Sequence, residues 1–372
     1  MKAVVYHGPH DLRYEEVPDP QIRHSQDIIV RVTAAAICGT DLHILHGTLP
    51  GMKPGTILGH EFVGVVEQLG PDVTSLQEGD RVLVPTTIAC GWCFFCRRGD
   101  FSQCDNATPS KTPGWFGGPE QAGAYPGGQA ELVRVPFANT GPLVIPDALA
   151  DEEAVMLTDV FPAGFMAAEL AGIRPGDVVV VFGCGPVGLC AQKSARLLGA
   201  TRVIAVDGIE ERLDLARQEN QAETIDFRKT DPVQAIRERT GGLGAESCID
   251  AVGAEAVNRE GKHQPIQALL WAVEAVRKAG TIAVVGSYGQ EAAHFPLVQA
   301  FSKNVTWRQG VCNHRTYIPR LIAYVLSGQV DPAFLLTHVL PLDDVLVGYD
   351  LFNRRDQGCI KAVLQTAPEE LG

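Results

Sequence analysis

The chain has 372 residues, of which 45% are hydrophobic, and its formal net charge is −13. This length predicts two or three domains rather than a single core. The negative charge argues against a nucleic-acid partner, and the lack of a long apolar run argues against a membrane partner. The first residues lack the apolar stretch of a signal peptide, so we expect a cytoplasmic protein. In that reducing compartment its ten cysteines favour metal binding over disulfides.

The first third of the sequence consists of short apolar runs separated by turn residues. We predict strands at residues 2–6, 13–17, 28–32, 62–67, 79–84 and 131–135. Glycine and proline predict irregular loops at 47–55 and 108–128, and residues 90–104 form a cysteine-rich loop. The pattern indicates a mostly β domain.

The pattern changes near residue 151, where helices are predicted at 151–157 and 163–171. Strands are then predicted at 178–182, 202–206, 224–226, 247–251, 282–285 and 305–308. Helices are predicted between them at 187–198, 210–218, 232–239 and 266–278. Six strands with intervening helices predict an α/β fold with a doubly wound parallel sheet.

This alternation stops after about residue 310. The tail is predicted to contain helices at 318–327 and 343–352 and a strand at 359–364. We assign it to the first domain. The catalytic domain then comprises residues 1–155 and 311–372, and the cofactor domain comprises residues 156–310.

A glycine-rich turn lies between the first strand and the first helix of the alternating region. Its residues are Gly183, Cys184, Gly185, Pro186, Val187 and Gly188, which match the dinucleotide-binding pattern G-x-G-x-x-G. Such a turn lets the backbone approach a pyrophosphate at the N-terminus of a helix, whereas the alternative is a glycine turn without a ligand. Asp207 ends the next strand, where an acid binds the ribose hydroxyls and repels a 2′-phosphate. NAD is therefore favoured over NADP, although Arg212 could accept that phosphate.

The cysteine-rich loop contains Cys90, Cys93, Cys96 and Cys104. Four thiolates at these spacings can surround one structural Zn²⁺ ion. An iron–sulfur cluster and a pair of disulfides are the alternatives.

Cys38 and His60 are two further candidate ligands, although two ligands do not define a metal site and each could be a core residue. Glu61 follows His60, and Thr40 and His43 follow Cys38. The other cysteines and histidines, including His314, match no ligand pattern.

The sequence resembles zinc-dependent medium-chain alcohol dehydrogenases. The matching motifs are CGTDLH at 38–43, GHEFVGVVEQLG at 59–70, GDRV at 79–82, the four-cysteine loop and GCGPVG at 183–188. The sequences at 211–227 and 250–256 are most similar to the bacterial branch that contains glutathione-independent formaldehyde dehydrogenases. The resemblance implies a Rossmann cofactor domain and a mostly β, GroES-like catalytic domain.

The resemblance also implies a catalytic zinc ion in addition to the structural one, giving two per chain. Cys38, His60 and Asp159 would bind it, with Asp159 in place of a cysteine found in many members, and Glu61 remains open as the third ligand. The zinc would lower the pKa of a bound alcohol, NAD would accept hydride, and Thr40 and His43 would pass the proton to solvent. Thr40 as a turn hydroxyl and His43 as a surface imidazole are the alternatives.

The resemblance places Val252 and Ser287 beside the cofactor and Lys361 at its pyrophosphate, although Lys361 could be an exposed lysine instead. The expected substrate is a small alcohol or aldehyde, and the expected assembly is a homotetramer or a homodimer. A threonine or polyol dehydrogenase is the alternative within the superfamily. A non-catalytic dinucleotide-binding protein is the alternative of another class, but such proteins usually lose the metal ligands.

Overall fold

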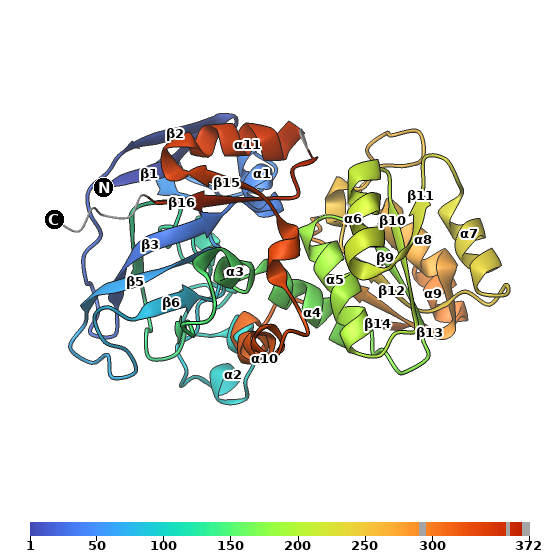
Figure 1. The fold of residues 1–372 in the computed structure, drawn as a ribbon, viewed down its shortest axis with the longest axis horizontal. Coiled ribbons are helices and arrows are strands. Elements are labelled where there is room, and N and C mark those ends of the chain that lie inside the picture. The colour runs from blue at the N-terminus through green and yellow to red at the C-terminus, as the bar shows by residue number, and fades with distance from the viewer. Residues whose placement is uncertain (290–294, 355–357, 367–372) are drawn as a thin grey trace. The chain divides into compact units, whose positions relative to one another are not determined.

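The computed structural model describes residues 1–289, 295–354 and 358–366 and separates the chain into two compact units. Unit 1 comprises Met1–Pro162 and Asn313–Gly372, and unit 2 comprises Ala163–Cys312. The sequence prediction placed the two boundaries at 155/156 and 310/311. Each unit has its own sheet system (Figure 1).

Unit 1 is built on two sheets. One has the strand order β2-β1-β4, and the other has the order β15-β16-β3-β5-β6-β8, with β7 also paired to β3. The strands are β1 (Lys2–Gly8), β2 (Asp11–Glu16), β3 (Ile28–Ala36), β4 (Thr56–Ile57), β5 (Phe62–Leu69), β6 (Arg81–Val84), β7 (Leu132–Val135), β8 (Leu143–Val144), β15 (Leu336–Pro341) and β16 (Lys361–Gln365). All six strands predicted in the first third are present, and the predicted last strand corresponds to β16.

A buried aliphatic cluster fixes the register of the larger sheet. Val30 of β3 pairs with Val66 of β5, and Phe62 of β5 pairs with Val84 of β6. These side chains are at most 1% exposed and belong to one core cluster, which also contains Cys90, Cys96 and Cys104 of the cysteine-rich loop. The cysteine-rich loop is therefore attached directly to the hydrophobic core.

The helices of unit 1 range from 4 to 13 residues in length. They are α1 (Gly39–Leu45), α2 (Phe94–Arg97), α3 (Asp151–Met156), α10 (His314–Leu326) and α11 (Val345–Arg354), with 3-10 turns η1 (Phe101–Gln103), η2 (Glu120–Ala122), η5 (Pro332–Leu335) and η6 (Leu342–Asp344). α4 (Val160–Leu170) continues from unit 1 into unit 2. The sequence did not predict α1, α2, β4, β8 or β15. It also began α10 at 318, whereas the helix begins at His314.

Unit 2 contains one parallel sheet of six strands in the order β11-β10-β9-β12-β13-β14. The elements are β9 (Val178–Phe182), α5 (Pro186–Leu197), β10 (Arg202–Asp207), α6 (Glu210–Asn220), β11 (Glu223–Asp226), α7 (Pro232–Arg239), β12 (Ala245–Asp250), η3 (Gly253–Glu255), α8 (Gln267–Ala275), β13 (Val276–Val284), α9 (Leu297–Ser302) and β14 (Thr306–Gln309). The predicted doubly wound parallel sheet is confirmed.

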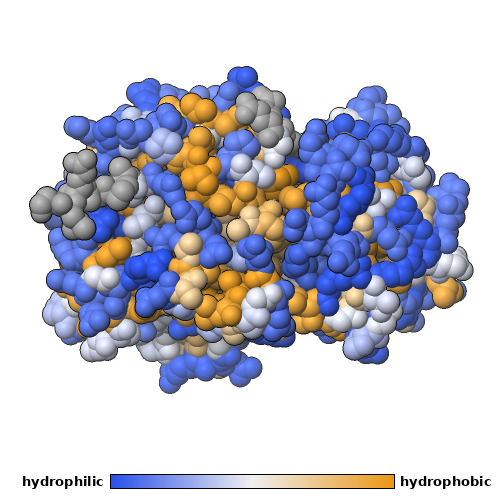
Figure 2. Space-filling model, in the orientation of Figure 1, coloured by the Kyte–Doolittle hydropathy of each residue, from blue (hydrophilic) through white to orange (hydrophobic). Residues whose placement is uncertain are grey.

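The strand order explains the placement of the helices. From β9 the chain moves outward through β10 to β11, then returns through β12, β13 and β14 in the other direction. Right-handed crossovers in opposite directions put their helices on opposite faces of the sheet. α5 and α6 contact each other on one face, and Figure 2 shows that the outer surface of α6 is hydrophilic.

The predicted helix 266–278 is too long. α8 ends at Ala275, and Val276 already begins β13 by pairing with Ala245. No helix in the described parts of the chain is long and apolar enough to cross a membrane.

Candidate active site and metal centres

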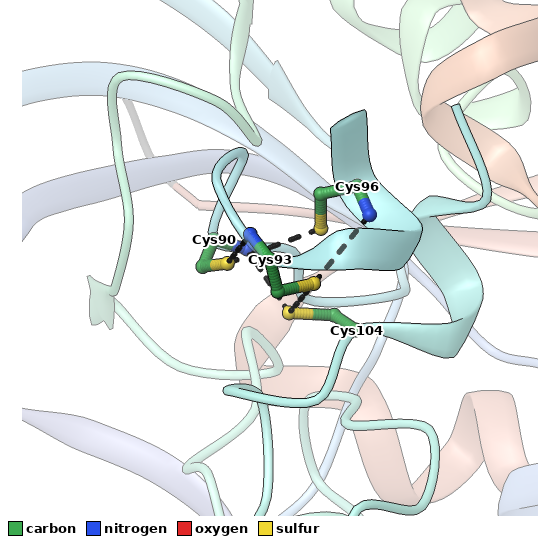
Figure 3. A group of neighbouring side chains, drawn as sticks. All are labelled: Cys90, Cys93, Cys96 and Cys104. Carbon is green, nitrogen blue, oxygen red and sulfur yellow. Dashed lines mark hydrogen bonds between the residues drawn. The ribbon is translucent and has the colours of Figure 1, made fainter. Parts of the chain in front are cut away.

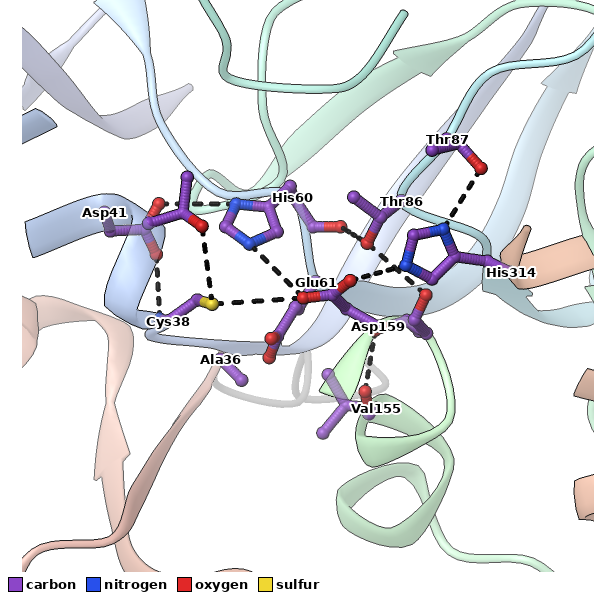
Figure 4. Close-up of polar contacts among 12 residues, drawn as sticks. Ala36, Cys38, Asp41, His60, Glu61, Thr86, Thr87, Val155, Asp159 and His314 are labelled. Carbon is purple, nitrogen blue, oxygen red and sulfur yellow. Dashed lines mark hydrogen bonds and ion pairs between the residues drawn. The ribbon is translucent and has the colours of Figure 1, made fainter. Parts of the chain in front are cut away.

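Four potential metal ligands from three separate segments meet in unit 1. Cys38, His60, Glu61 and Asp159 each offer an atom within 4.8 Å of the others. Oδ2 of Asp159 lies 3.9 Å from Sγ of Cys38 and 3.7 Å from Nε2 of His60. Figure 4 shows these three side chains converging. Ligands about 2.0–2.3 Å from one tetrahedral zinc ion lie about 3.3–3.8 Å apart, so the three atoms are close to the spacing that zinc requires.

Local backbone structure sets the positions of these ligands. Cys38 precedes α1, and its N–H donates to Oδ2 of Asp41 at 2.9 Å. His60 follows Gly59, whose φ of +101° favours glycine and where a Cβ would lie 2.5 Å from the backbone nitrogen of Gln129. Asp159 lies between α3 and α4. A helix start, a glycine turn and a helix junction thus bring the ligands together.

A buried carboxylate lies behind His60. Oδ1 of Asp41 is 3.4 Å from Nδ1 of His60, and both residues are at most 3% exposed. Gln129 donates to Oδ2 of Asp41 at 3.2 Å, and the hydroxyl of Tyr349 donates to Oε1 of Gln129 at 2.7 Å. Because Nδ1 faces Asp41, Nε2 is left for a metal, as in the carboxylate–histidine pairs of zinc sites.

The electrostatics of the site favour an added positive charge. Burial raises the pKa of the Cys38 thiol, and the nearby charge of Glu61 raises it further. Burial alone would lower the pKa of His60, but the charges of Asp41 and Cys38 outweigh it and raise the pKa well above its usual value. Both shifts favour the protonated forms. A divalent cation would supply the same positive charge and displace these protons.

The four cysteines of the loop are also gathered (Figure 3). Sγ of Cys90 is 4.0 Å from Sγ of Cys96, and Sγ of Cys93 is 4.0 Å from Sγ of Cys104. A disulfide requires about 2.05 Å, and all four cysteines are free, which excludes the disulfide alternative in this structure. Their atoms lie within 4.8 Å of one another, as a closed four-sulfur zinc site requires.

Backbone N–H groups point at these sulfur atoms. The N–H groups of Trp92 and Cys93 donate to Sγ of Cys90 at 3.4 Å, and that of Cys96 donates to Sγ of Cys93 at 3.4 Å. Burial acts to raise the pKa of Cys93, but the N–H of Cys96 and other donors outweigh it and lower the pKa to about 7. These donors thus stabilise the thiolate form of Cys93, whereas burial raises the pKa of Cys96 and of Cys104.

The glycine turn of unit 2 has the geometry that its pattern predicts. Gly185 is the N-cap of α5, and Pro186 occupies the first turn, followed by Val187. A Cβ on Gly188 would lie 2.0 Å from the carbonyl oxygen of Gly183, so only glycine lets α5 pack this close to the turn. The N-terminus of α5 therefore directly follows the turn after β9, which is the arrangement that the dinucleotide-binding pattern requires.

The predicted ribose ligand lies beside this turn. Oδ2 of Asp207 accepts the N–H of Cys184 at 2.7 Å, and Oδ1 accepts those of Gly208 and Ile209. These bonds fix the carboxylate at the end of β10. Arg212 lies close to Gly185.

The other two predicted cofactor residues of unit 2 lie near the same turn. A Cβ on Gly183 would be 2.8 Å from Val252, and the carbonyl oxygen of Ser287 accepts the N–H of Ala254 at 2.8 Å. The structure therefore gathers Gly183, Val252 and Ser287 beyond the carboxyl ends of the neighbouring strands β9, β12 and β13.

Comparisons with known proteins agree with this arrangement. Residues 24–147 match the alcohol dehydrogenase GroES-like domain, and residues 186–327 match the zinc-binding dehydrogenase domain. An uncharacterised zinc-type alcohol dehydrogenase-like protein of Bacillus subtilis is 43% identical, over 98% of this chain and 100% of that protein. The chain belongs to the zinc-type medium-chain alcohol dehydrogenase family. It is therefore an oxidoreductase, as the sequence predicted.

Other members of the family extend this result. The alcohol dehydrogenase of Thermus sp. ATN1 is 36% identical and superposes with a TM-score of 0.86, over 99% of this chain and 100% of that one. An alcohol dehydrogenase of Escherichia coli CFT073, solved with NADH, is 27% identical with a TM-score of 0.81, over 98% and 99% of the two chains. A formaldehyde dismutase of Pseudomonas putida is 34% identical over 95% of both chains.

One residue of this dehydrogenase site was missed by the sequence analysis. Nε2 of His314 lies 2.5 Å from Oδ1 of Asp159, and Nδ1 lies 3.1 Å from Oγ1 of Thr87. Burial would raise the pKa of Asp159, but the contacts with His314 and His60 outweigh it and hold the pKa well below its usual value. No motif pointed to His314, because the contact joins residues 155 positions apart.

Lys361 lies elsewhere than the sequence suggested. Its Nζ is 2.5 Å from Oε2 of Glu61, and the two side chains are 1% and 0% exposed. The alternative of an exposed lysine is therefore wrong, and the ammonium is directed at Glu61. Burial raises the pKa of Glu61 to about 7 even though Lys361 acts to lower it.

The two residues of the expected proton path lie on α1. Oγ1 of Thr40 is 3.9 Å from Sγ of Cys38, and Nδ1 of the half-exposed His43 is 3.3 Å from Oγ1 of Thr48. Residues three apart on a helix lie on the same side. Thr40 and His43 therefore extend from the candidate metal site toward a partly exposed position.

Proposed function

We propose that Cys38, His60 and Asp159 hold a catalytic zinc ion at which this enzyme oxidises a small alcohol, or a hydrated aldehyde, with NAD. The observation that carries the proposal is that the two carboxylate oxygens of Asp159 make different contacts. Its Oδ2 faces Cys38 and His60, while its Oδ1 is bonded to His314. Zinc would act there as a Lewis acid that lowers the pKa of the alcohol, and NAD would accept the hydride.

The same geometry supports Asp159 rather than Glu61 as the resting third ligand. Oε2 of Glu61 is directed at the ammonium of Lys361, 2.5 Å away. A carboxylate in a buried ion pair must give up that pair before it can bind a metal, and this exchange costs free energy. Oδ2 of Asp159 instead faces Sγ of Cys38 and Nε2 of His60, which are themselves proposed ligands of the metal.

The chain's own residues supply the remaining steps. Asp41 orients His60, so that Nε2 is presented to the metal. The hydroxyl of Thr40 would accept the proton of the alcohol as it passes its own proton on, and His43 would deliver a proton to solvent. In unit 2 the N-terminus of α5 would bind the pyrophosphate, and Asp207 would bind the ribose hydroxyls and repel a 2′-phosphate.

The aspartate at position 159 also supports placing this chain near the formaldehyde dehydrogenase-like bacterial branch, because many members of the wider family have a cysteine at this position. The formaldehyde dismutase of P. putida, at 34% identity, is consistent with this. The long cofactor-holding insertion of formaldehyde-specific members is not evident in the sequence. We therefore infer an exchangeable NAD and a preference for alcohols.

The proposal is tested by NAD reduction across short alcohols, formaldehyde, threonine and sorbitol, with zinc counted in the same preparation. We expect turnover with a short alcohol, weaker turnover with NADP, and two zinc ions per chain. Preferred turnover of threonine or sorbitol would assign the chain to those branches. One zinc ion per chain and no turnover would indicate a protein that binds a dinucleotide without catalysis.

The expected proton path predicts a pH-dependent effect of His43. His43→Ala should slow turnover most below pH 7, where hydroxide is too scarce to replace an imidazole as proton acceptor. Zinc content should stay at two ions per chain. The measurement is the pH profile of kcat, with His46→Ala at the end of the same helix as control. A profile identical to that of the unmodified enzyme would exclude this path.

A homotetramer is the assembly that we propose, with a homodimer as the other outcome. β14 is an edge strand of the sheet of unit 2. Leu297, Val298 and Phe301 of the preceding helix α9 are 68%, 82% and 82% exposed. An open strand edge and exposed apolar side chains both favour pairing between chains. Light scattering gives the mass, and a monomer would exclude the proposal.

A further inference from the structure

Both ring nitrogens of His314 are engaged in a buried setting. His314 and Thr87 are 3% and 4% exposed. Nε2 contacts Oδ1 of Asp159 at 2.5 Å, and Nδ1 contacts Oγ1 of Thr87 at 3.1 Å. An ionised carboxylate has no proton to give, so Nε2 is the donor in the first contact. The ring is therefore fixed from both sides (Figure 4).

This contact decides which oxygen of Asp159 is available to a metal. With Oδ1 bonded to His314, Oδ2 remains directed at Cys38 and His60. Groups that hydrogen-bond to metal ligands orient them, and losing such a group typically costs about 10–100-fold in metal affinity or activity. His314 thus has the place of a positioning residue for the third ligand.

The residues around His314 are held by the four-cysteine loop. We name residues 313–316 the bridge segment. Nδ2 of Asn313 donates to the carbonyl oxygen of Gly99 at 2.5 Å, and the N–H of Ser102 donates to Oδ1 of Asn313 at 3.2 Å. Oγ1 of Thr316 donates to the same carbonyl of Gly99 at 3.0 Å. Gly99 and Ser102 lie between Cys96 and Cys104, so three hydrogen bonds join the bridge segment to the loop.

A second connection reaches the other end of the loop. Nε of Arg315 donates to the carbonyl oxygen of Thr140 at 2.7 Å. Oγ1 of Thr140 in turn donates to the carbonyl oxygen of Cys90 at 3.1 Å. The bridge segment therefore contacts Gly99 and Ser102 directly and is connected to Cys90, at the start of the loop, through Thr140.

We propose that the bridge segment couples the two metal centres, with the four-cysteine loop holding His314 in place and His314 orienting Asp159 for the catalytic zinc. The inference rests on the proposed ligation by Asp159. The four-cysteine loop would then stabilise the catalytic metal site in addition to stabilising its own fold. Zinc in the loop then raises the affinity of the catalytic site, and by linkage the reverse also holds.

The test measures zinc affinity of the full-length protein by titration with a chelator, while zinc is counted by elemental analysis. Asp159→Ala identifies which zinc pool is catalytic. His314→Leu should lower the affinity for the catalytic zinc about 10-fold or more. His314→Gln keeps an N–H donor and should therefore recover part of this affinity. Asn313 contacts none of the proposed ligands of the catalytic zinc, yet Asn313→Ala should lower the zinc affinity of the catalytic site about 5-fold. Arg320→Ala, an exposed position on α10, is the matched control.

The outcomes separate this inference from the proposed function. An affinity of the catalytic pool within 2-fold of the unmodified enzyme in His314→Leu would overturn the positioning role. The same result in Asn313→Ala alone would overturn the coupling. A zinc content that Asp159→Ala does not change would overturn the proposed ligation and this inference together. Far-UV circular dichroism confirms that each variant is folded, and His314→Gln keeps the test valid where His314→Leu does not fold.

Discussion

Asp159→Ala is expected to reduce the zinc content from two ions per chain to one and to lower kcat about 10³-fold. Two remaining ligands, Cys38 and His60, do not hold zinc in a site that normally uses three protein ligands. The lost Lewis acid contributes several kcal/mol, and about 4 kcal/mol corresponds to about 10³-fold in rate. Elemental analysis and steady-state kinetics measure the two effects. The remaining zinc should stay in the four-cysteine loop.

Two further variants make this result specific. Asp147→Ala removes an exposed carboxylate of unit 1 and should change neither zinc content nor kcat. Asp159→Cys should restore zinc binding, because a thiolate is the ligand that many members of the family have at this position. Full zinc retention with activity in Asp159→Ala would instead identify Glu61 as the third ligand.

The parts of the fold that could be predicted are those that local sequence determines. β9 and β10 are largely apolar runs, and each of the six strands of unit 2 was found within a few residues, apart from the early start of β13. The start of α10 was not found: the helix was predicted from 318, one residue before Pro319, and proline is usual only in the first turn of a helix. The structure instead continues the helix through Pro319 from His314. α1 has only seven residues and begins with Gly39 and Thr40, which are weak helix formers.

The same distinction holds for the site. The four cysteines and the glycine turn are local patterns whose spacing specifies a geometry, and both are gathered as expected. His314 and Lys361 reach the site through tertiary contacts with residues far away in the sequence. The contact of His314 with Asp159 and the contact of Lys361 with Glu61 could therefore not be predicted from residue spacing. Because the predicted helix began at 318, the sequence analysis also did not show that His314 is the first residue of α10.

Lys361→Met is expected to lower the free energy of unfolding by about 3–5 kcal/mol, because it leaves the buried carboxylate of Glu61 without its partner. The ion pair is short, and both side chains are almost completely buried. Urea unfolding of the zinc-loaded enzyme measures the effect. Lys278→Met, at an exposed lysine, is the control and should cost less than about 0.5 kcal/mol. A loss that small in Lys361→Met would show that the pair is not buried.

The pH dependence identifies Glu61 as the origin of this loss. Burial raises the pKa of Glu61 to about 7 with Lys361 present, and removing the ammonium raises the pKa further. In the unfolded chain the carboxyl titrates near pH 4.3, so above that pH folding requires Glu61 to stay protonated or to ionise while buried. Below about pH 7 Glu61 is protonated in both folded proteins, so the loss of stability in Lys361→Met should stay nearly constant from pH 5 to 7 and grow above pH 7, where Glu61 ionises only beside Lys361. Adding Glu61→Gln removes the titrating group, so the double variant should recover most of the stability and lose this dependence on pH. A double variant as unstable as Lys361→Met would instead trace the loss to the packing of the lysine side chain.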